Sequence, residues 1–531
     1  MCISFVAAAA AQERVYVSTD KECYVAGENL WYSLYCYDEA SGGYSNLSDV
    51  AYLQFVSNDG VAATHKGALI GGRGCGRFQI PLDLPTGNYM IVAYTRHSGG
   101  DSKGEFNGKI ISVFNTLSVA RVKDGVVRLE EAAPVGAHAP AGGNIAVEVG
   151  PVKDGAAGVV LRNASGAPVQ VSVSVYHNDG LTKLSGRYDC TSLLERRGDF
   201  QSTGEVEYAG EVVRARVTGK DGGSAEGKYV FLSGIGNTDD VYMNKVGADG
   251  VVSFFTGNIM GKRDLLFEVV GDTSAAYNVE LLHDVHSRKV AAIPALGLDA
   301  SMEQALRERG RRMQISRMFT PDTLFEMGTV KDNMFEGNTG RLVYNLDEYT
   351  RFQNLEETLR EYVKYARVRM NGVEPEIKVI WEENGRPLVL LDGVPVSDHS
   401  VVLGLDQSLV KQIAVYPVRY MINQFMYDGI VSFVTYKGDM GGVKLPKNMS
   451  VVGFDGVSWP LAMLGGKVVS NGGYPDFLST IYWNPVVEIP AGGEFGFKCV
   501  LPQYKGNFKI VVEGIDAAWN EVCGAGAFVV E

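Results

Sequence analysis

The feature that most constrains this chain is the recurrence of short stretches in which residues alternate with a period of two. One such stretch covers residues 30–37, and another, Val169–Val175, places valines between Gln and Ser residues. Alternation of this kind is typical of strands with one face in a core. Turns rich in Gly, Asn and Asp separate the stretches at roughly 8–12-residue intervals, which is typical of antiparallel sandwiches. We therefore expect a mainly β protein of tandem antiparallel β-sandwiches.

Helical patterns appear in one part of the chain, after Pro294. The run Ser301-Met302-Glu303-Gln304 has the spacing of a capping box, and Asn354-Leu355-Glu356-Glu357 predicts a second helix start. The first helix carries five arginines between residues 307 and 317. We interpret them as a solvated helix face, with docking on an acidic partner or on lipid phosphates as the alternative. Strand patterns after the second helix predict one small α+β domain.

These patterns divide the chain into segments that we expect to be separate domains or linkers. The first segment, Met1–Ala11, ends in an apolar run and three alanines, which indicates the remnant of a secretory signal peptide. The expected segments are the signal-peptide remnant (1–11), a β-sandwich (12–120), a second β-sandwich (121–204), a third β-sandwich (205–290), a helical linker (291–334), the α+β domain (335–440) and a C-terminal β-sandwich (441–531).

Export is the expected fate of the chain, to the periplasm or to the periphery of the outer membrane. Cleavage after Ala11 leaves six cysteines, an even number that oxidising compartments favour, while their pairing stays open. No run of about 20 apolar residues is present, so no transmembrane segment is expected. The remaining cysteines are Cys23, Cys36, Cys75, Cys190, Cys499 and Cys523.

Charge and motif content argue against nucleic-acid binding and against catalysis. The chain has 49 basic and 62 acidic residues and a net charge of −13, whereas nucleic-acid binding needs a basic face. The motifs HExxH, GxSxG and CxxC are absent. The pair His283 and His286 has no third ligand nearby in sequence, and we interpret it as linker. We expect no enzyme activity, no cofactor, no metal and no catalytic residues; a hydrolase with a site assembled between domains is a further alternative.

The first sandwich segment carries a recognisable pattern. Thr19-Asp20-Lys21 is followed by Tyr24 and by Gly27-Glu28, and a later hairpin reads Leu84-Pro85-Thr86-Gly87-Asn88-Tyr89. This pattern resembles the opening of the macroglobulin MG2 domain, which implies an MG2-like sandwich over residues 12–120. Cys75-Gly76 is followed by Arg77 where thioester macroglobulins have Glu, so the resemblance implies no covalent trapping.

The α+β segment carries a second pattern. The segments Pro387–Pro395, Leu409–Tyr416 and Gly429–Thr435 are similar in content and order to the plug domain of TonB-dependent receptors. The resemblance implies a plug-like domain over residues 335–440. About ninety residues follow it, too few for the many membrane strands of a transporter barrel.

The order of these segments resembles Gram-negative envelope proteins that combine an MG2-like domain with a plug-like domain. The run Ala248–Phe254 resembles carboxypeptidase-regulatory-like sandwiches, and Tyr474–Pro485 resembles the closing domain of those envelope proteins. The resemblance implies a non-catalytic exported scaffold or binding protein that docks on an outer-membrane complex or transporter. The alternative is a macroglobulin-like binder of proteases or peptides without a thioester. The partner is expected to be a protein, peripheral membrane association is left open, and the binding residues are not identified.

Overall fold

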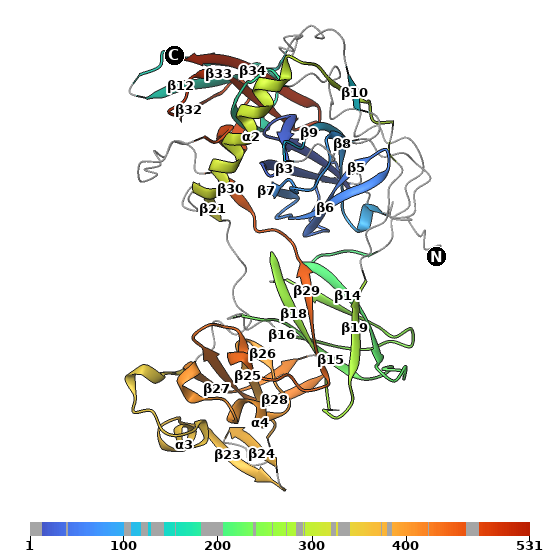
Figure 1. Cartoon of the computed structure of the whole chain (residues 1–531), viewed down its shortest axis with the longest axis vertical. Coiled ribbons are helices and arrows are strands. Elements are labelled where there is room, and N and C mark those ends of the chain that lie inside the picture. The colour runs from blue at the N-terminus through green and yellow to red at the C-terminus, as the bar shows by residue number, and fades with distance from the viewer. Residues whose placement is uncertain are drawn as a thin grey trace, which may run out of the picture. The chain divides into compact units, whose positions relative to one another are not determined.

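The computed structural model places the chain in two compact units, whose elements are labelled in Figure 1. Unit 1 consists of residues 1–208, 286–329 and 457–531, and unit 2 consists of residues 209–285 and 330–456. The structure describes residues 13–38, 41–99, 108–117, 126–128, 143–153, 155–181, 205–236, 241–257, 259–271, 273–282, 290, 292–319, 325–327, 340–372, 374–379, 385–422, 424–463 and 477–531.

The first sandwich of unit 1 has two sheets around an aromatic-rich core, and it confirms the β-sandwich architecture expected for this region. Tyr24, Tyr32, Phe55 and Tyr89 are fully buried in that core. One sheet contains β1 (Glu13–Thr19), β3 (Asn29–Asp38) and β4 (Gly43–Tyr44), with β7 (Arg73–Gln79) also paired to β3. The other has the order β2 (Cys23–Val25), β9 (Lys109–Phe114), β8 (Gly87–Tyr94), β5 (Val50–Ser57) and β6 (Gly60–Ala68).

The second sandwich of unit 1 is assembled from two distant parts of the chain. One sheet has the order β11 (Ile145–Val149), β12 (Ala156–Asn163) and β32 (Glu494–Val500). The other has the order β31 (Thr480–Ile489), β13 (Val169–His177), β33 (Gly506–Asp516) and β34 (Glu521–Val530).

This pairing joins two segments that we expected to form separate sandwiches, residues 121–204 and residues 441–531. Strand β13 is central, because β31 pairs with one of its edges and β33 with the other. Period-two alternation identifies a strand and its buried face but not the partner strand. Strands β11, β12 and β13 from the earlier segment do not enclose a core by themselves, so the C-terminal strands complete it.

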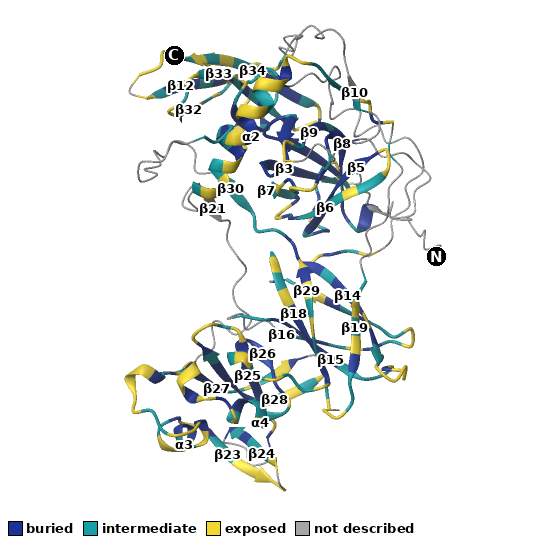
Figure 2. Ribbon diagram, in the orientation of Figure 1, coloured by how far each residue is buried: buried dark blue, intermediate teal, exposed yellow. Residues whose placement is uncertain are grey.

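The two sandwiches of unit 1 pack against each other through aromatic rings and an ion pair. The ring centroid of Trp519 lies 4.3 Å from that of Tyr37 and 5.1 Å from that of Tyr44. Lys109 Nζ lies 2.6 Å from a carboxylate oxygen of Glu513. Strand β3 is therefore buried on both faces, and Figure 2 shows it mainly in dark blue.

A long helix, α2 (Met302–Phe319), completes unit 1 and lies where the sequence predicts a helix. The predicted capping box does not form, because the Ser301 hydroxyl donates to Asp299 and the Gln304 amide donates to Glu308. The smaller elements of unit 1 are η1 (His97–Gly99), β10 (Val126–Arg128), β20 (Leu296–Leu298), β21 (Phe325–Met327) and β30 (Leu461–Met463).

Unit 2 contains a third sandwich, which also takes a strand from further along the chain. Its last strand, β29, pairs with β18 and lies in the segment that we expected to belong to the C-terminal sandwich. One sheet has the order β17 (Val251–Thr256), β14 (Glu211–Gly219) and β19 (Tyr277–Leu281). The other has the order β16 (Val241–Lys245), β15 (Tyr229–Gly234), β18 (Lys262–Val269) and β29 (Met449–Asp455).

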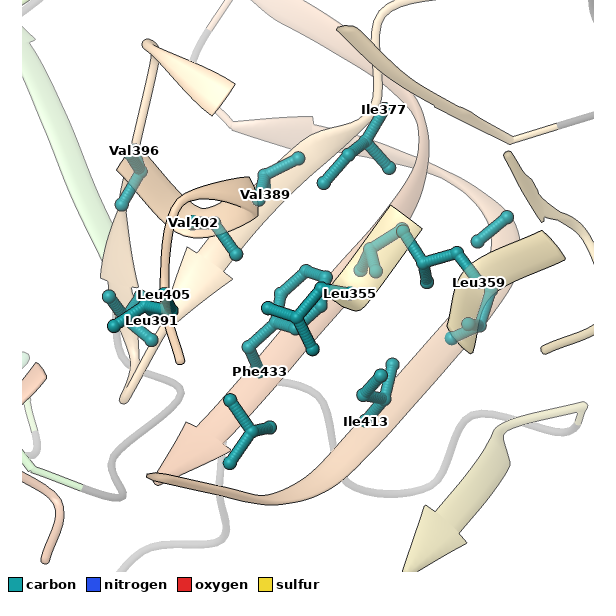
Figure 3. Close-up of a cluster of buried hydrophobic side chains, with 14 of the residues drawn as sticks. Leu355, Leu359, Ile377, Val389, Leu391, Val396, Val402, Leu405, Ile413 and Phe433 are labelled. Atoms are coloured by element: carbon teal, nitrogen blue, oxygen red, sulfur yellow. The ribbon is translucent and has the colours of Figure 1, made fainter. Parts of the chain in front are cut away.

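The α+β region of unit 2 is a mixed five-stranded sheet with short helices, as the sequence predicts. Asn354 caps α3 by accepting from the backbone NH of Glu357 at 2.8 Å, and Leu355, Leu359 and Phe433 meet in the core (Figure 3). The sheet has the order β22 (Leu342–Asn345), β27 (Val410–Ile422), β28 (Phe425–Thr435), β25 (Leu388–Leu391) and β26 (Val394–Pro395). The other elements are η3 (Leu346–Glu348), α3 (Leu355–Glu361), β23 (Ala366–Asn371), β24 (Glu374–Val379), α4 (His399–Leu403), η4 (Gln407–Leu409) and η5 (Met440–Gly442).

The Asp-Gly turn of the plug-like pattern has a structural role in this sheet. Asp392 and Gly393 both have positive φ, 49° and 81°, and they form the tight turn between β25 and β26. The buried Asp392 carboxylate accepts from the backbone NH and the hydroxyl of Thr435 at 2.7 and 2.6 Å, and from the backbone NH of Met440 at 2.8 Å. The turn is therefore tied to the end of β28.

Candidate functional site

The candidate functional site is a cleft of about 270 Å³ in unit 1. It lies between the first sandwich, helix α2 and the chain segment that leads into β31. Three parts of the sequence therefore supply its walls, and none of them forms it alone. The lining residues are Lys21, Gly27, Glu28, Asn29, Trp31, Arg77, Gln79, Met313, Ser316, Arg317, Phe477, Leu478, Ser479 and Thr480.

The Thr-Asp-Lys part of the MG2-like pattern forms a buried network at this site. Asp20 Oδ1 accepts from the Tyr24 hydroxyl at 2.7 Å and from the backbone NH of Trp31 at 3.0 Å. Lys21 Nζ lies 3.1 Å from Asp20 Oδ2 and donates to Thr480 Oγ1 at 3.2 Å. Burial, together with the Asp20 carboxylate, raises the pKa of Tyr24 well above its ordinary value. The Tyr24 hydroxyl therefore remains a donor at all physiological pH values.

The Gly-Glu part of the same pattern forms a buried ion pair with helix α2. Nε and Nη2 of Arg309 each lie 3.0 Å from one carboxylate oxygen of Glu28, a bidentate geometry. Nη1 of Arg309 lies 3.1 Å from Asp179. Burial acts to raise the pKa of Glu28, but the charges of Arg309 and Lys21 outweigh it and hold that pKa below its ordinary value. Glu28 is therefore ionised at neutral pH.

The arginine-rich face of α2 differs from the solvated face that we expected. Arg309 is only 5% exposed, and its acidic partners belong to the same chain. Arg307, Arg311 and Arg317 are exposed, as expected for a solvated face. The spacing of arginines along the helix does not reveal which of them turns inward, because that depends on where Glu28 and Asp179 lie in the fold.

Two glycines permit the close approach of α2. Gly27 has a φ of 94°, and a Cβ at that position would lie 2.8 Å from Leu82 Cδ2 and 2.9 Å from Met313 Sδ. A Cβ on Gly310 would lie 2.7 Å from Thr116 Oγ1. A side chain at either position would push the helix away from the sandwich, so both glycines help to set the width of the cleft.

The described lining of the cleft carries three cationic side chains and one carboxylate. The Arg77 guanidinium lies 5.9 Å from the ring centroid of Trp31, and Arg317 is exposed on the last turn of α2. Ser316 Oγ is buried and has no hydrogen-bond partner among the described residues. The described cleft therefore combines net positive charge, an aromatic wall and a buried hydroxyl without a described partner.

Three of the described cysteines, Cys23, Cys75 and Cys499, do not offer a reactive thiolate. Burial raises the pKa of the Cys23 and Cys499 thiols to about 12 and that of Cys75 to about 11. Cys75 and Gln79 both lie on the extended strand β7, which separates them by roughly 13 Å along its axis. A thioester between these two side chains is therefore excluded by geometry.

One histidine lies close to helix α2 but is not basic. Arg312 Nη1 lies 3.2 Å from His177 Nδ1, and its guanidinium lies 4.4 Å from the ring centroid of Tyr504. Burial and the charge of Arg312 lower the pKa of His177 to about 4. His177 is therefore neutral at pH 7 and accepts through Nδ1. No group of three or more potential metal ligands occurs among the residues that the structure describes.

Unit 2 contains a buried carboxyl group that has no cationic partner among the described residues. Glu268, on β18, is 1% exposed, and its Oε1 accepts from the backbone NH of Ser397 at 3.2 Å. Its Oε2 and the Oδ1 of the buried Asn448 have no hydrogen-bond partner among the described residues. Burial, with a smaller contribution from the nearby Asp398 carboxylate, raises the pKa of Glu268 to about 7.

Several residues singled out in the sequence lie outside the described part of the structure. These include the signal-peptide segment 1–11, Cys190, and the pair His283 and His286. Among the helices that the structure does describe, none combines the length and apolar character needed to cross a bilayer.

Comparison with known proteins gives weak structural neighbours. No protein-family model and no curated protein matches the chain. The native α-2-macroglobulin of Escherichia coli is 10% identical, with a TM-score of 0.24 over 98% of this chain and 40% of that chain. The Salmonella α-2-macroglobulin reacted with methylamine is also 10% identical, with a TM-score of 0.23 over 100% and 40%. The chain thus spans about two fifths of these neighbours, and no residue role is transferred from them.

The sequence patterns indicate no binding residue, and the cleft shows why. The packing roles of Tyr24 and Gly27 could be inferred from the MG2-like pattern, and Tyr24 is indeed fully buried. Ser316 and Arg317 carry no sequence signal beyond the density of arginines in their helix. Only the docking of α2 beside β3 and β7 brings them to the same cleft.

Proposed function

We propose that this chain is a non-catalytic binding protein that holds a peptide segment of a protein partner in the cleft of unit 1. The observation that carries this proposal is the cleft itself, whose walls are joined by the buried pair of Glu28 and Arg309. Walls held together in this way need little ordering when a ligand arrives, which lowers the entropic cost of binding.

The lining of the cleft supports binding rather than catalysis. Its described residues include neither histidine nor cysteine, the side chains that most often serve as base and nucleophile. The carboxylate in the described lining, Glu28, is engaged by Arg309 on both oxygens. A paired carboxylate of lowered pKa is a poor general base at neutral pH.

The size of the cleft favours one of the two binding roles expected from the sequence. A cleft of about 270 Å³ accommodates one or two residues of a peptide. Stable docking between folded proteins buries roughly 1,200–2,000 Å² of surface and needs no such cleft. A binder of proteases or peptides is therefore our first proposal. Docking on an outer-membrane complex, with a plug-like domain as the contact, is the second.

The proposal places the protein outside the cytoplasm, on the strength of the apolar run Ile3–Ala11. Cell fractionation and N-terminal sequencing of the mature protein test this placement. Recovery of the full-length chain in the cytoplasm would contradict it.

Affinity capture from solubilised cell envelopes tests the binding role. We expect immobilised protein to retain a partner that the double variant Arg77→Glu/Arg317→Glu does not retain, because both changes reverse charges in the cleft. The matched control is Arg307→Glu/Arg311→Glu, which makes the same charge change on the exposed face of α2, outside the cleft.

The outcomes separate the alternatives. Soluble proteases or peptides in the cleft-dependent fraction support the first proposal. A membrane barrel that both double variants still retain supports docking by another surface. An identical set of proteins on all three baits, with no barrel, contradicts both roles.

A further inference from the structure

We propose that the cleft of unit 1 recognises a glutamate side chain in an extended segment of its partner, with Arg317 and Arg77 as ionic partners and Ser316 as hydrogen-bond donor. This inference rests on the proposed binding function and specifies the chemistry of the ligand. It follows from the charge, the unsatisfied hydroxyl and the apolar wall of the cleft.

The charge of the cleft opposes that of the chain. Its lining contains Lys21, Arg77 and Arg317 against Glu28, whereas the chain as a whole has a net charge of −13. Lys21 and Glu28 are each engaged by a buried partner, at 3.1 and 3.0 Å. The exposed guanidinium of Arg317 is therefore the group best placed to attract an anion, and a local cationic site on an acidic protein favours anionic ligands.

Ser316 gives a second and independent indication of a ligand. Its Oγ is buried and has no hydrogen-bond partner among the described residues, although it belongs to the lining of the cleft. A buried hydroxyl without a partner is unfavourable, so an acceptor supplied by the ligand stabilises it. A carboxylate has two acceptor oxygens and can contact the hydroxyl and a guanidinium together.

The apolar part of the lining favours a carboxylate that is carried on methylene groups. Trp31, Met313 and Leu478 line the same cleft as the charged groups. An inorganic anion would leave this surface without an apolar contact, whereas the methylene groups of a glutamate side chain can pack against it. The volume of about 270 Å³ holds such a side chain and part of its neighbour.

The test uses the full chain and three defined peptides in isothermal titration calorimetry. The first is N-acetyl-Gly-Leu-Glu-Leu-Gly-amide, the second has Gln in place of Glu, and the third has Gln and a free C-terminal carboxylate. We expect the glutamate peptide to bind at least about fivefold more tightly than the glutamine peptide, with an affinity that falls as salt is added. The third peptide distinguishes a side-chain carboxylate from a terminal one.

Variants assign the binding to the cleft. We expect Arg317→Gln and Ser316→Ala each to weaken binding of the glutamate peptide about three- to tenfold. Arg311→Gln, an exposed arginine of the same helix outside the cleft, is the control and should leave the affinity unchanged. Circular dichroism of each variant shows that the fold is intact.

The inference is overturned by equal binding of the glutamate and glutamine peptides, by tighter binding of the peptide with the terminal carboxylate, or by an affinity unaffected by Arg317→Gln. Absence of binding up to about 5 mM overturns it as well. If envelope capture still depends on the cleft in any of these cases, the ligand class is wrong while the binding function stands. If capture is independent of the cleft, the function itself fails.

Discussion

Each unit buries ionisable side chains between its own elements. The charge of the buried carboxyl group is compensated differently in the two units. In unit 1, Glu28 contacts Arg309 through two hydrogen bonds of 3.0 Å, and Arg309 also contacts Asp179. In unit 2, Glu268 forms no ion pair with a described residue, and the groups that act on it include the Asp398 carboxylate. Tyr427, whose own pKa burial and Glu268 raise to about 12, is uncharged at neutral pH.

The difference shows that burial alone does not decide whether a carboxyl group is charged. A bidentate guanidinium keeps Glu28 ionised despite burial, whereas Glu268 without a cation has a pKa raised to about 7. The two units should therefore respond to different changes, unit 1 to loss of a cation and unit 2 to rising pH.

The largest expected effect comes from removing the cation of unit 1. Arg309→Met leaves Glu28 and Asp179 buried without a positive partner, and loss of one partner of a buried pair costs about 3–5 kcal/mol. Urea unfolding, with hydrogen exchange measured on peptides from α2 and β3, reports the loss. Arg311→Met is the control, since Arg311 is exposed, and a loss below about 1 kcal/mol for Arg309→Met would show that the pair contributes little.

Glu268→Gln should have the next largest effect, and only at high pH. Because the folded pKa is raised from 4.5 to about 7, the carboxyl group costs stability as pH rises through that range, reaching about 3 kcal/mol above it. Glutamine does not ionise and keeps the shape of the protonated acid. We expect the variant to be more stable than the wild type at pH 8.5 and nearly equal to it at pH 4.5.

Hydrogen exchange at several pH values, followed on β18 and α4, measures this effect. The same substitution at the exposed Glu226, also in unit 2, is the control and should not change the pH profile. Parallel profiles for the wild type and Glu268→Gln would show that Glu268 does not titrate in this range.

The smallest effect concerns His177 in unit 1. Its pKa is lowered from 6.5 to about 4, so the stability linked to the neutral ring is present above pH 6.5 and is lost as pH falls toward 4. We expect His177→Gln to decrease the loss of unfolding free energy at acidic pH by about 1 kcal/mol. This value is smaller than for a fully buried ring, because solvent screens a ring that is only partly buried. Unfolding at pH 7 and at pH 4.5 measures it, and unchanged slopes would contradict the shift.

The sequence predicted elements better than it predicted partners. Alternation located strands such as Val169–His177, and the Asn354 cap marked the start of α3. Neither signal carries information on pairing, so the union of β13 with β31 and β33 was not foreseen. Non-local pairing depends on which strands complete a core, and one sequence does not show that.

The cleft was harder to predict for the same reason. The pattern around Tyr24 and Gly27 implied an MG2-like sandwich, but it did not indicate that Glu28 meets Arg309. Two charged residues 281 positions apart leave no joint signal in a single sequence. The described cleft depends on that meeting, because it fixes α2 beside the sandwich.

The discontinuous second sandwich of unit 1 has a consequence for biosynthesis. Residue 169 pairs with residue 489, so β13 leaves the ribosome long before either of its neighbours has been translated. Until then its edges are open to other chains, which makes the nascent protein dependent on protection against aggregation. A premature stop before β31 would leave the first sandwich intact, yet the second could not close, and the product would be a substrate for proteolysis.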